Sequence, residues 1–206
     1  MKQQRTAFAE VIESSITHAT GLSWEWANLP TLCALIKIIQ APYTLFGCIT
    51  NIKTGSNDPL RQAFAYQKTE AELLQEQPQI FSFLQTTFTI QILGYSKEDT
   101  PLSYLLPPQP AKLHGFITYA TTDEYHKFFS NPEFLNLFFL QNDAGIDQDE
   151  LLLALLRNLR DTIGIDPAFI QALCLYRSSM HTADYKNIKR FMQRLQQLLW
   201  LQLKAN

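Results

Sequence analysis

The sequence predicts an α+β protein in which a small antiparallel β-barrel is followed by a C-terminal helical bundle. Three stretches of different hydrophobic spacing predict this fold. The spacing is helical at the amino terminus, close to two between about residues 31 and 120, and helical again beyond residue 120. We therefore divide the chain into an N-terminal amphipathic helix with an aromatic anchor (1–29), a barrel domain (30–120) and a helical domain (121–206).

The N-terminal helix is predicted from apolar and small residues that recur at helical intervals. They are spaced i, i+3, i+4, i+7, i+8 and i+11, and are Phe8, Val11, Ile12, Ser15, Ile16 and Ala19. Gly21 is placed to end this helix. We expect Trp24 and Trp26, which follow, to anchor the helix against the next element.

Four strands are predicted for the barrel, at residues 32–39, 44–53, 87–94 and 113–120. The third is the clearest, because Phe88, Ile90 and Ile92 alternate with polar residues, as in a half-buried strand. The turn-forming residues 54–59 are expected to end the second strand. A capping box at 69–72 predicts a short helix between the second and third strands.

Several helix-start signals follow residue 120. They are two capping boxes, at 121–124 and 147–150, and an N-cap followed by proline at Asp166 and Pro167. A last helix is predicted over about 183–203, with an apolar stripe made of Ile188, Phe191, Met192, Leu195, Leu198 and Leu199.

Composition excludes several protein classes. The chain has 206 residues, a net charge of −2 and 46% hydrophobic residues, so it can bury a core and is not a disordered chain. Its three cysteines have no CxxC spacing and apolar neighbours, which indicates buried thiols in a reducing cytoplasm. Glu10 and Glu13 interrupt any secretory signal, and the longest strictly apolar run, 151–156, is far too short for a membrane span.

The motifs of common enzyme classes are missing from the sequence. No glycine is followed by lysine, so a phosphate-binding loop is excluded, and with it nucleotide hydrolysis by this chain alone. The four histidines have no metal-ligand spacing; Asp123 and His126 lie one helical turn apart, but a second such pair is missing. There is no GxSxG motif, and no cysteine has basic neighbours. The sequence therefore predicts no catalytic residue, no cofactor and no metal ligand.

One basic ridge is a candidate nucleic-acid site. Lys186, Arg190 and Arg194 recur every four residues on the last predicted helix, with Lys189 beside them. Such a ridge can contact phosphates. The alternatives are an ordinary solvated helix face or a contact with an acidic protein.

The segments 46–52, 65–66, 77–81 and 92–95 together resemble a HAS-barrel, the N-terminal β-barrel of HerA-type DNA translocases and of ATP synthase subunits. The shared pattern is a strand with a glycine near its start, a turn-rich insertion with a short helix, and a strand that ends at Leu93 and Gly94. The resemblance covers about residues 30–120. It implies a barrel that assembles subunits and contacts partners, without the RecA-like core that hydrolyses ATP in those proteins.

We therefore expect a non-enzymatic interaction or assembly module, serving as an accessory of a ring ATPase or of a DNA-processing complex. Its expected partner is a protein or a second copy of the chain, with no membrane and no nucleotide involved. One alternative is a small enzyme whose dispersed site uses His114, Tyr119 and Asp123 near one end of the barrel. The other is a weak nucleic-acid-binding protein that uses the basic ridge.

Overall fold

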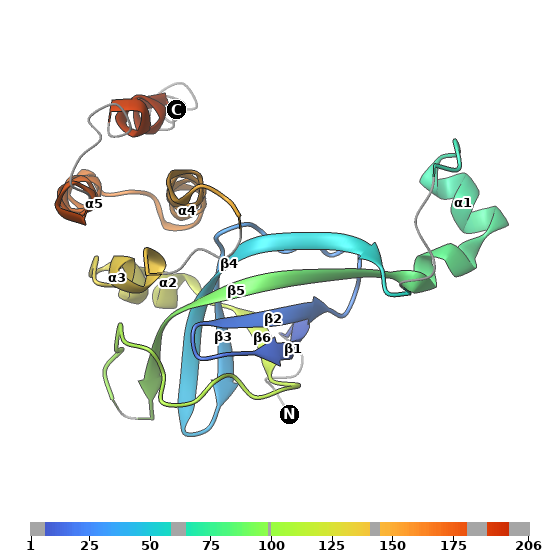
Figure 1. The fold of residues 1–206 in the computed structure, drawn as a ribbon, viewed down its shortest axis with the longest axis horizontal. Helices are drawn as coiled ribbons and strands as arrows, with labels where there is room; N and C mark the ends of the chain where they lie inside the picture. Colours follow the sequence, from blue (N-terminus) through green and yellow to red (C-terminus); the bar gives the residue numbers. More distant parts are fainter. Residues whose placement is uncertain (1–6, 59–64, 99, 141–144, 181–188, 198–206) are drawn as a thin grey trace.

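A computed structural model describes residues 7–58, 65–98, 100–140, 145–180 and 189–197 of the chain (Figure 1). Six antiparallel strands close into a barrel in the order β1-β2-β5-β4-β3-β6. The strands are β1 (Ala9–Ser14), β2 (His18–Ser23), β3 (Leu35–Gln40), β4 (Tyr43–Ser56), β5 (Leu84–Lys97) and β6 (Phe116–Tyr119). Helices lie against one side of this barrel, which confirms the α+β class with a small barrel and C-terminal helices.

The predicted N-terminal helix is wrong, because this segment forms the hairpin β1–β2 and belongs to the barrel. A short run of apolar residues fits helical and strand spacing alike, and here the pairing of β1 with both β2 and β6 decides between them. Gly21 does not end a helix. A Cβ atom at this position would lie 2.5 Å from Cζ of Phe88, so glycine is required for the close approach of that ring.

The four barrel strands predicted after residue 30 correspond to β3, β4, β5 and β6. Phe88, Ile90 and Ile92 all point into the barrel core, as their alternation predicts. The turn predicted at 54–59 is wrong in its start, because β4 continues to Ser56, which pairs with Leu84 of β5. Long-range pairing with β5 thus overrides the turn-forming composition of this segment.

The barrel interior is filled by side chains. Its fully buried members include Ile36 and Ile38 of β3, Leu45 of β4 and Ile90 of β5. These side chains therefore form a packed core between the strands.

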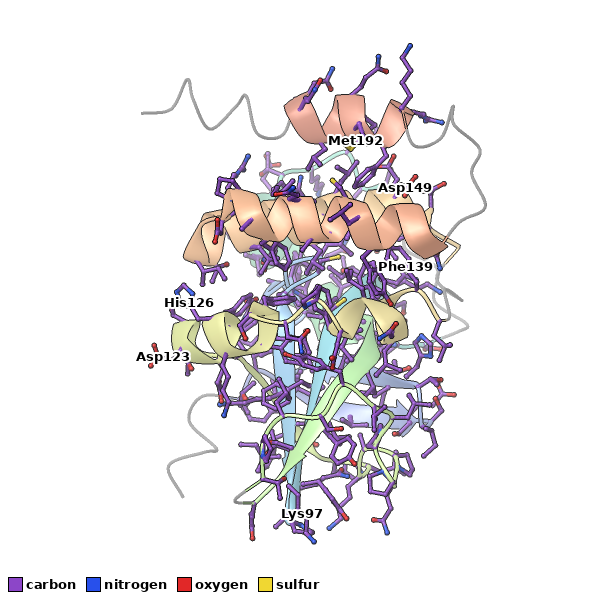
Figure 2. All side chains as sticks on the ribbon, turned by 90° about the vertical axis from the view of Figure 1, so that its left-hand side faces the viewer. Lys97, Asp123, His126, Phe139, Asp149 and Met192 are labelled. Carbon is purple, nitrogen blue, oxygen red and sulfur yellow. The ribbon has the colours of Figure 1, made fainter. Side chains whose placement is uncertain are left out.

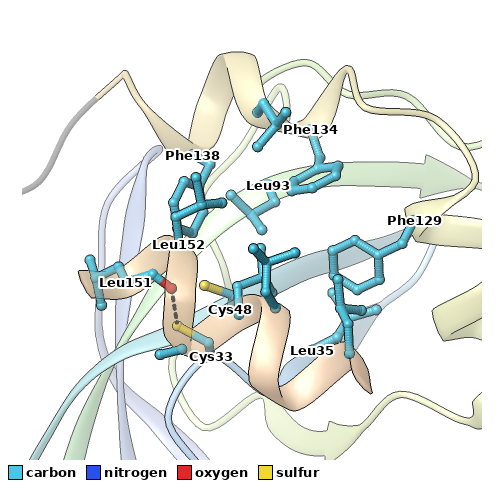
Figure 3. Close-up of a cluster of buried hydrophobic side chains, with 14 of the residues drawn as sticks. Cys33, Leu35, Cys48, Leu93, Phe129, Phe134, Phe138, Leu151 and Leu152 are labelled. Atoms are coloured by element: carbon cyan, nitrogen blue, oxygen red, sulfur yellow. Dashed lines mark hydrogen bonds between the residues drawn. The ribbon is translucent and has the colours of Figure 1, made fainter. Parts of the chain in front are cut away.

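A second core lies between the outside of the barrel and the helices. The helices are α2 (Thr122–Phe129), α3 (Phe134–Phe138), α4 (Gln148–Ile163) and α5 (Pro167–Met180), and residues 189–197 form a further helix. Figure 2 shows them in successive layers on the barrel, with Met192 in the outermost one. Leu35, Cys48 and Leu93 point outward from the strands into this core, and Cys33 donates from Sγ to the Leu151 carbonyl oxygen, 3.3 Å away (Figure 3).

Tyr125 of α2 fastens the helices to the barrel. Its hydroxyl accepts the N–H of Leu35, the first residue of β3, at 2.7 Å, and donates to Oδ1 of Asn158 on α4 at 3.1 Å. Lys37 of β3 adds an ion pair with Glu124, at 2.6 Å. One strand is thereby connected through side chains to two helices.

The helix-start signals are confirmed where the structure describes them. Thr69 and Thr121 form complete capping boxes, and Asp166 accepts a backbone N–H group at the start of α5. The capping box predicted at 147–150 forms only in part: Asp147 accepts the N–H of Asp149 and begins α4, whereas the Glu150 carboxylate pairs with Arg194. Helix α3 was not predicted from the sequence. Within the last predicted helix, 189–197 is helical and buries Phe191 and Leu195, while the rest of the range 183–203 lies outside the described residues.

Candidate interaction surface

The β4–β5 hairpin extends beyond the barrel as a long arm, which we define as residues 53–85 (Figure 1). It carries α1 (Glu70–Glu76) and a 3-10 helix (Pro78–Phe83). None of the arm residues that the structure describes, 53–58 and 65–85, is buried. The described residues of the arm therefore belong to neither core of the protein.

Side chains from the barrel hold the arm at its root. The ring of Trp26, after β2, stacks on Phe81 with a centroid separation of 5.7 Å. Thr86 Oγ1 donates to the Trp26 carbonyl oxygen at 2.6 Å and lies 2.9 Å from Thr54 Oγ1 on the neighbouring strand. The arm consequently leaves the barrel in a defined direction.

Helix α1, at the far end of the arm, is acidic and presents an exposed leucine. Its seven residues include three glutamates and no basic residue, and Leu74 is 50% exposed. Hydrogen bonds from the backbone and side chain of Thr69 lower the pKa of Glu72. Glu76 pairs with Lys68. The Glu70 carboxylate forms no hydrogen bond or ion pair with a residue that the structure describes.

A basic pocket of about 420 Å³ lies between α4 and the 189–197 helix. Arg157, Arg160 and Arg194 line it together with one carboxylate, Glu150, and its other lining residues are Leu32, Ile146, Leu153, Ala154 and Gln197. The pocket thus combines an apolar wall with a basic rim.

The three arginines of the basic pocket differ in how they are neutralised. Arg194 forms a two-pronged ion pair with Glu150, and Arg160 lies 2.8 Å from Asp161. Arg157 is exposed and has no ion pair with any side chain in the described part of the chain. A guanidinium with five N–H donors is therefore available at this rim for an anionic group.

The structure does not bring together the three residues of the alternative enzyme site. His114 lies in the turn before β6 and Tyr119 is the last residue of that strand, so the two residues are at opposite ends of β6. Nδ1 of His114 lies 3.3 Å from Oε2 of Glu10, and the Tyr119 ring stacks on Phe8 at 4.3 Å. Asp123 is on the first turn of α2. Each therefore has a separate environment.

Two other pockets gather polar side chains without a recognisable catalytic pair. One, of about 710 Å³, lies between the barrel and α3, and Tyr104 in its lining donates to the Phe128 carbonyl oxygen. Burial, followed by the Glu133 carboxylate, raises the pKa of Tyr104 to about 12. The other, of about 630 Å³, lies between α2, α4 and α5 and includes His126 and Asp166. Asp166 is already used as the N-cap of α5.

The predicted basic ridge is described only in part. Lys189 and Arg190 are exposed on the 189–197 helix, whereas Arg194 is held by Glu150. Lys186 lies outside the described residues. Of the four residues proposed to contact nucleic acid, Lys189 and Arg190 are thus exposed cations that form no ion pair within the described part of the chain.

Sequence reasoning missed the arm and the basic pocket. The signals that were present are the adjacent Leu73 and Leu74 in a short helix that is otherwise polar, and Arg157 and Arg160 spaced i, i+3 on a helix. Neither pattern identifies a surface without knowledge of what covers it.

Comparisons with known proteins leave the family open. No family model matches the chain, and no curated protein matches it in sequence.

In the described part of the chain, no three His, Cys, Asp or Glu side chains are placed to hold a metal ion. None of the helices described there has the length and apolar composition that crossing a bilayer requires. The features that bear on function are therefore the barrel with its covering helices, the arm and the basic pocket.

Proposed function

We propose that the chain is a non-enzymatic interaction module, built on a HAS-like barrel, that binds a protein partner through its arm. One observation carries this proposal: the described residues of the arm bury no side chain, yet they include a capped helix with a half-exposed leucine. Ordering such a segment costs chain entropy that no core contact offsets. A partner that covers Leu74 would supply the missing burial.

The resemblance to HAS-barrels supports the same function, because in that family the barrel assembles subunits and contacts partners. A ring ATPase, a DNA-processing complex or a second copy of the chain is the partner class that follows from it. A reducing cytoplasm is the compartment we propose, in agreement with the three free thiols Cys33, Cys48 and Cys174.

A truncated arm tests the proposal. Ser56 and Leu84 are directly paired, so residues 57–83 can be replaced by the dipeptide Asn-Gly, which favours a tight hairpin turn. The wild-type and truncated chains are then used for affinity capture from the native host. We expect the truncated chain to lose a partner that the wild-type chain captures.

A substitution of an exposed leucine outside the arm serves as the control. Leu29, which is 58% exposed and outside the arm, is replaced by serine, and this variant should capture the same partner as the wild type. Circular dichroism must show that the truncated chain is folded. Identical sets of captured proteins for the folded truncated and wild-type chains would refute a binding role for the arm.

A further inference from the structure

We infer that the arm of one copy docks into the basic pocket of a second copy. This inference rests on the proposed function, because it assigns a particular partner to the arm. Both surfaces belong to this chain, and neither is covered by any residue that the structure describes.

The two surfaces cannot meet within one molecule. Helix α1 lies at the free end of the arm, whereas α4 lies above the other end of the barrel (Figure 1). The arm leaves the barrel as a paired two-stranded ribbon that ends at Ser56 and Leu84 and is braced by Trp26, so it is directed away from α4. A contact between them therefore joins two copies.

Charge complementarity selects this pairing. Helix α1 holds three glutamates and no basic residue, and the basic pocket is lined by three arginines and one glutamate. The Glu70 carboxylate and the Arg157 guanidinium are the charged groups of the two surfaces that have neither an ion pair nor a side-chain hydrogen bond among the described residues, because Glu72 is hydrogen-bonded to Thr69 and Glu76 is paired with Lys68. The docked arrangement pairs the Glu70 carboxylate with the Arg157 guanidinium as a charge-assisted hydrogen bond.

Apolar complementarity fits the same arrangement. Leu74 follows Glu70 by four residues, so both side chains lie on one face of α1. The pocket wall offers Leu153 and Ala154 beside Arg157, and its volume of about 420 Å³ lies in the usual range of ligand pockets and has room for a leucine side chain. Leu74 therefore enters the pocket while Glu70 reaches its rim.

The symmetry of the contact has a definite consequence. The arm and the basic pocket are different surfaces, so the interface is heterologous; when two copies associate, one copy still has a free pocket and the other a free arm for further copies. Such a contact produces a closed ring or an open filament rather than a two-fold dimer.

Charge reversal tests the inference. Glu70→Arg and Arg157→Glu are made singly and together in the full chain, and association is measured by sedimentation velocity over a wide concentration range at low salt. We expect the wild type to associate and each single variant to associate at least roughly tenfold more weakly, because like charges then face each other. The double variant should regain association, since the pair is restored with its charges exchanged.

Glu98→Arg makes the same charge change on an exposed loop away from both surfaces and should behave as the wild type. A strictly monomeric wild type, or association that survives both single reversals, would overturn the inference. A monomeric wild type whose arm still captures a different protein would overturn self-docking and leave the interaction function standing.

Discussion

Replacing Tyr125 with phenylalanine tests how the helices are attached to the barrel. The change removes only the hydroxyl, which accepts the N–H of Leu35 at 2.7 Å and donates to Asn158 at 3.1 Å. Leu35 is fully buried, so its N–H would lose its acceptor without gaining water. An unsatisfied buried donor costs about 1–3 kcal/mol. Asn158 is partly exposed and water can hydrate its side chain, so losing the hydrogen bond from Tyr125 adds little to the cost of the substitution.

The expected decrease in the free energy of unfolding is about 2 kcal/mol, which lowers the Tm by roughly 4–8 °C in a chain of this size. Urea unfolding followed by circular dichroism measures it, with an unchanged m value showing that the same surface is exposed. Tyr43→Phe is the matched control, because the Tyr43 hydroxyl has no hydrogen bond to a described residue. Its effect should stay within about 0.5 kcal/mol. If Tyr125→Phe costs no more than this control, the proposed attachment is refuted.

Three further predictions concern stability and binding. Gly21→Ala should lower the free energy of unfolding in urea by about 1–3 kcal/mol, because the new Cβ would lie 2.5 Å from a core ring. Gly55→Ala should lower it far less, because a Cβ at Gly55 would meet no atom within 4 Å. Burial is the largest cause that raises the pKa of Tyr125 to about 12 in the folded protein, from a value near 10 in the unfolded chain. The contribution of the neutral hydroxyl to the free energy of unfolding is therefore complete below about pH 10 and is lost as the pH rises through 12. Tyr125→Phe should reduce this loss of stability in urea titrations at about pH 9 to 12. For the basic ridge, we expect no binding of duplex DNA at low salt by fluorescence anisotropy, given the net charge of −2. Binding that lost about two units of log–log salt slope on replacing Lys189 and Arg190 with glutamine would contradict this expectation.

Local signals in the sequence were sufficient for much of the fold. The capping boxes at Thr69 and Thr121 depend on bonds over three residues, so they can be read without tertiary information. The alternation from Thr87 to Gly94 identified β5, because one face of that segment lines the barrel interior.

The errors arose where distant pairing determines the structure. Phe8, Val11 and Ile12 fit a helical stripe, but β1 is held by β2 on one side and by β6, distant in sequence, on the other. Residues 54–59 have the composition of a turn, yet residues through Ser56 pair with β5 and lengthen the hairpin into the arm. The arm's exposure and the environment of Arg157 depend on which elements lie nearby, and no local pattern reports that.

The pairing of β1 with β6 also constrains the order of events during synthesis. Ala9 pairs with Ile117, so the barrel cannot close until most of its sequence has left the ribosome. At about 5–20 residues per second, roughly 5–20 s pass between the appearance of these two strands. During that interval the outer edge of the β1–β2 hairpin presents unpaired backbone groups, which invite pairing with other chains. A nascent-chain chaperone can therefore bind this hairpin well before α2 to α5 have been synthesised to cover the barrel wall.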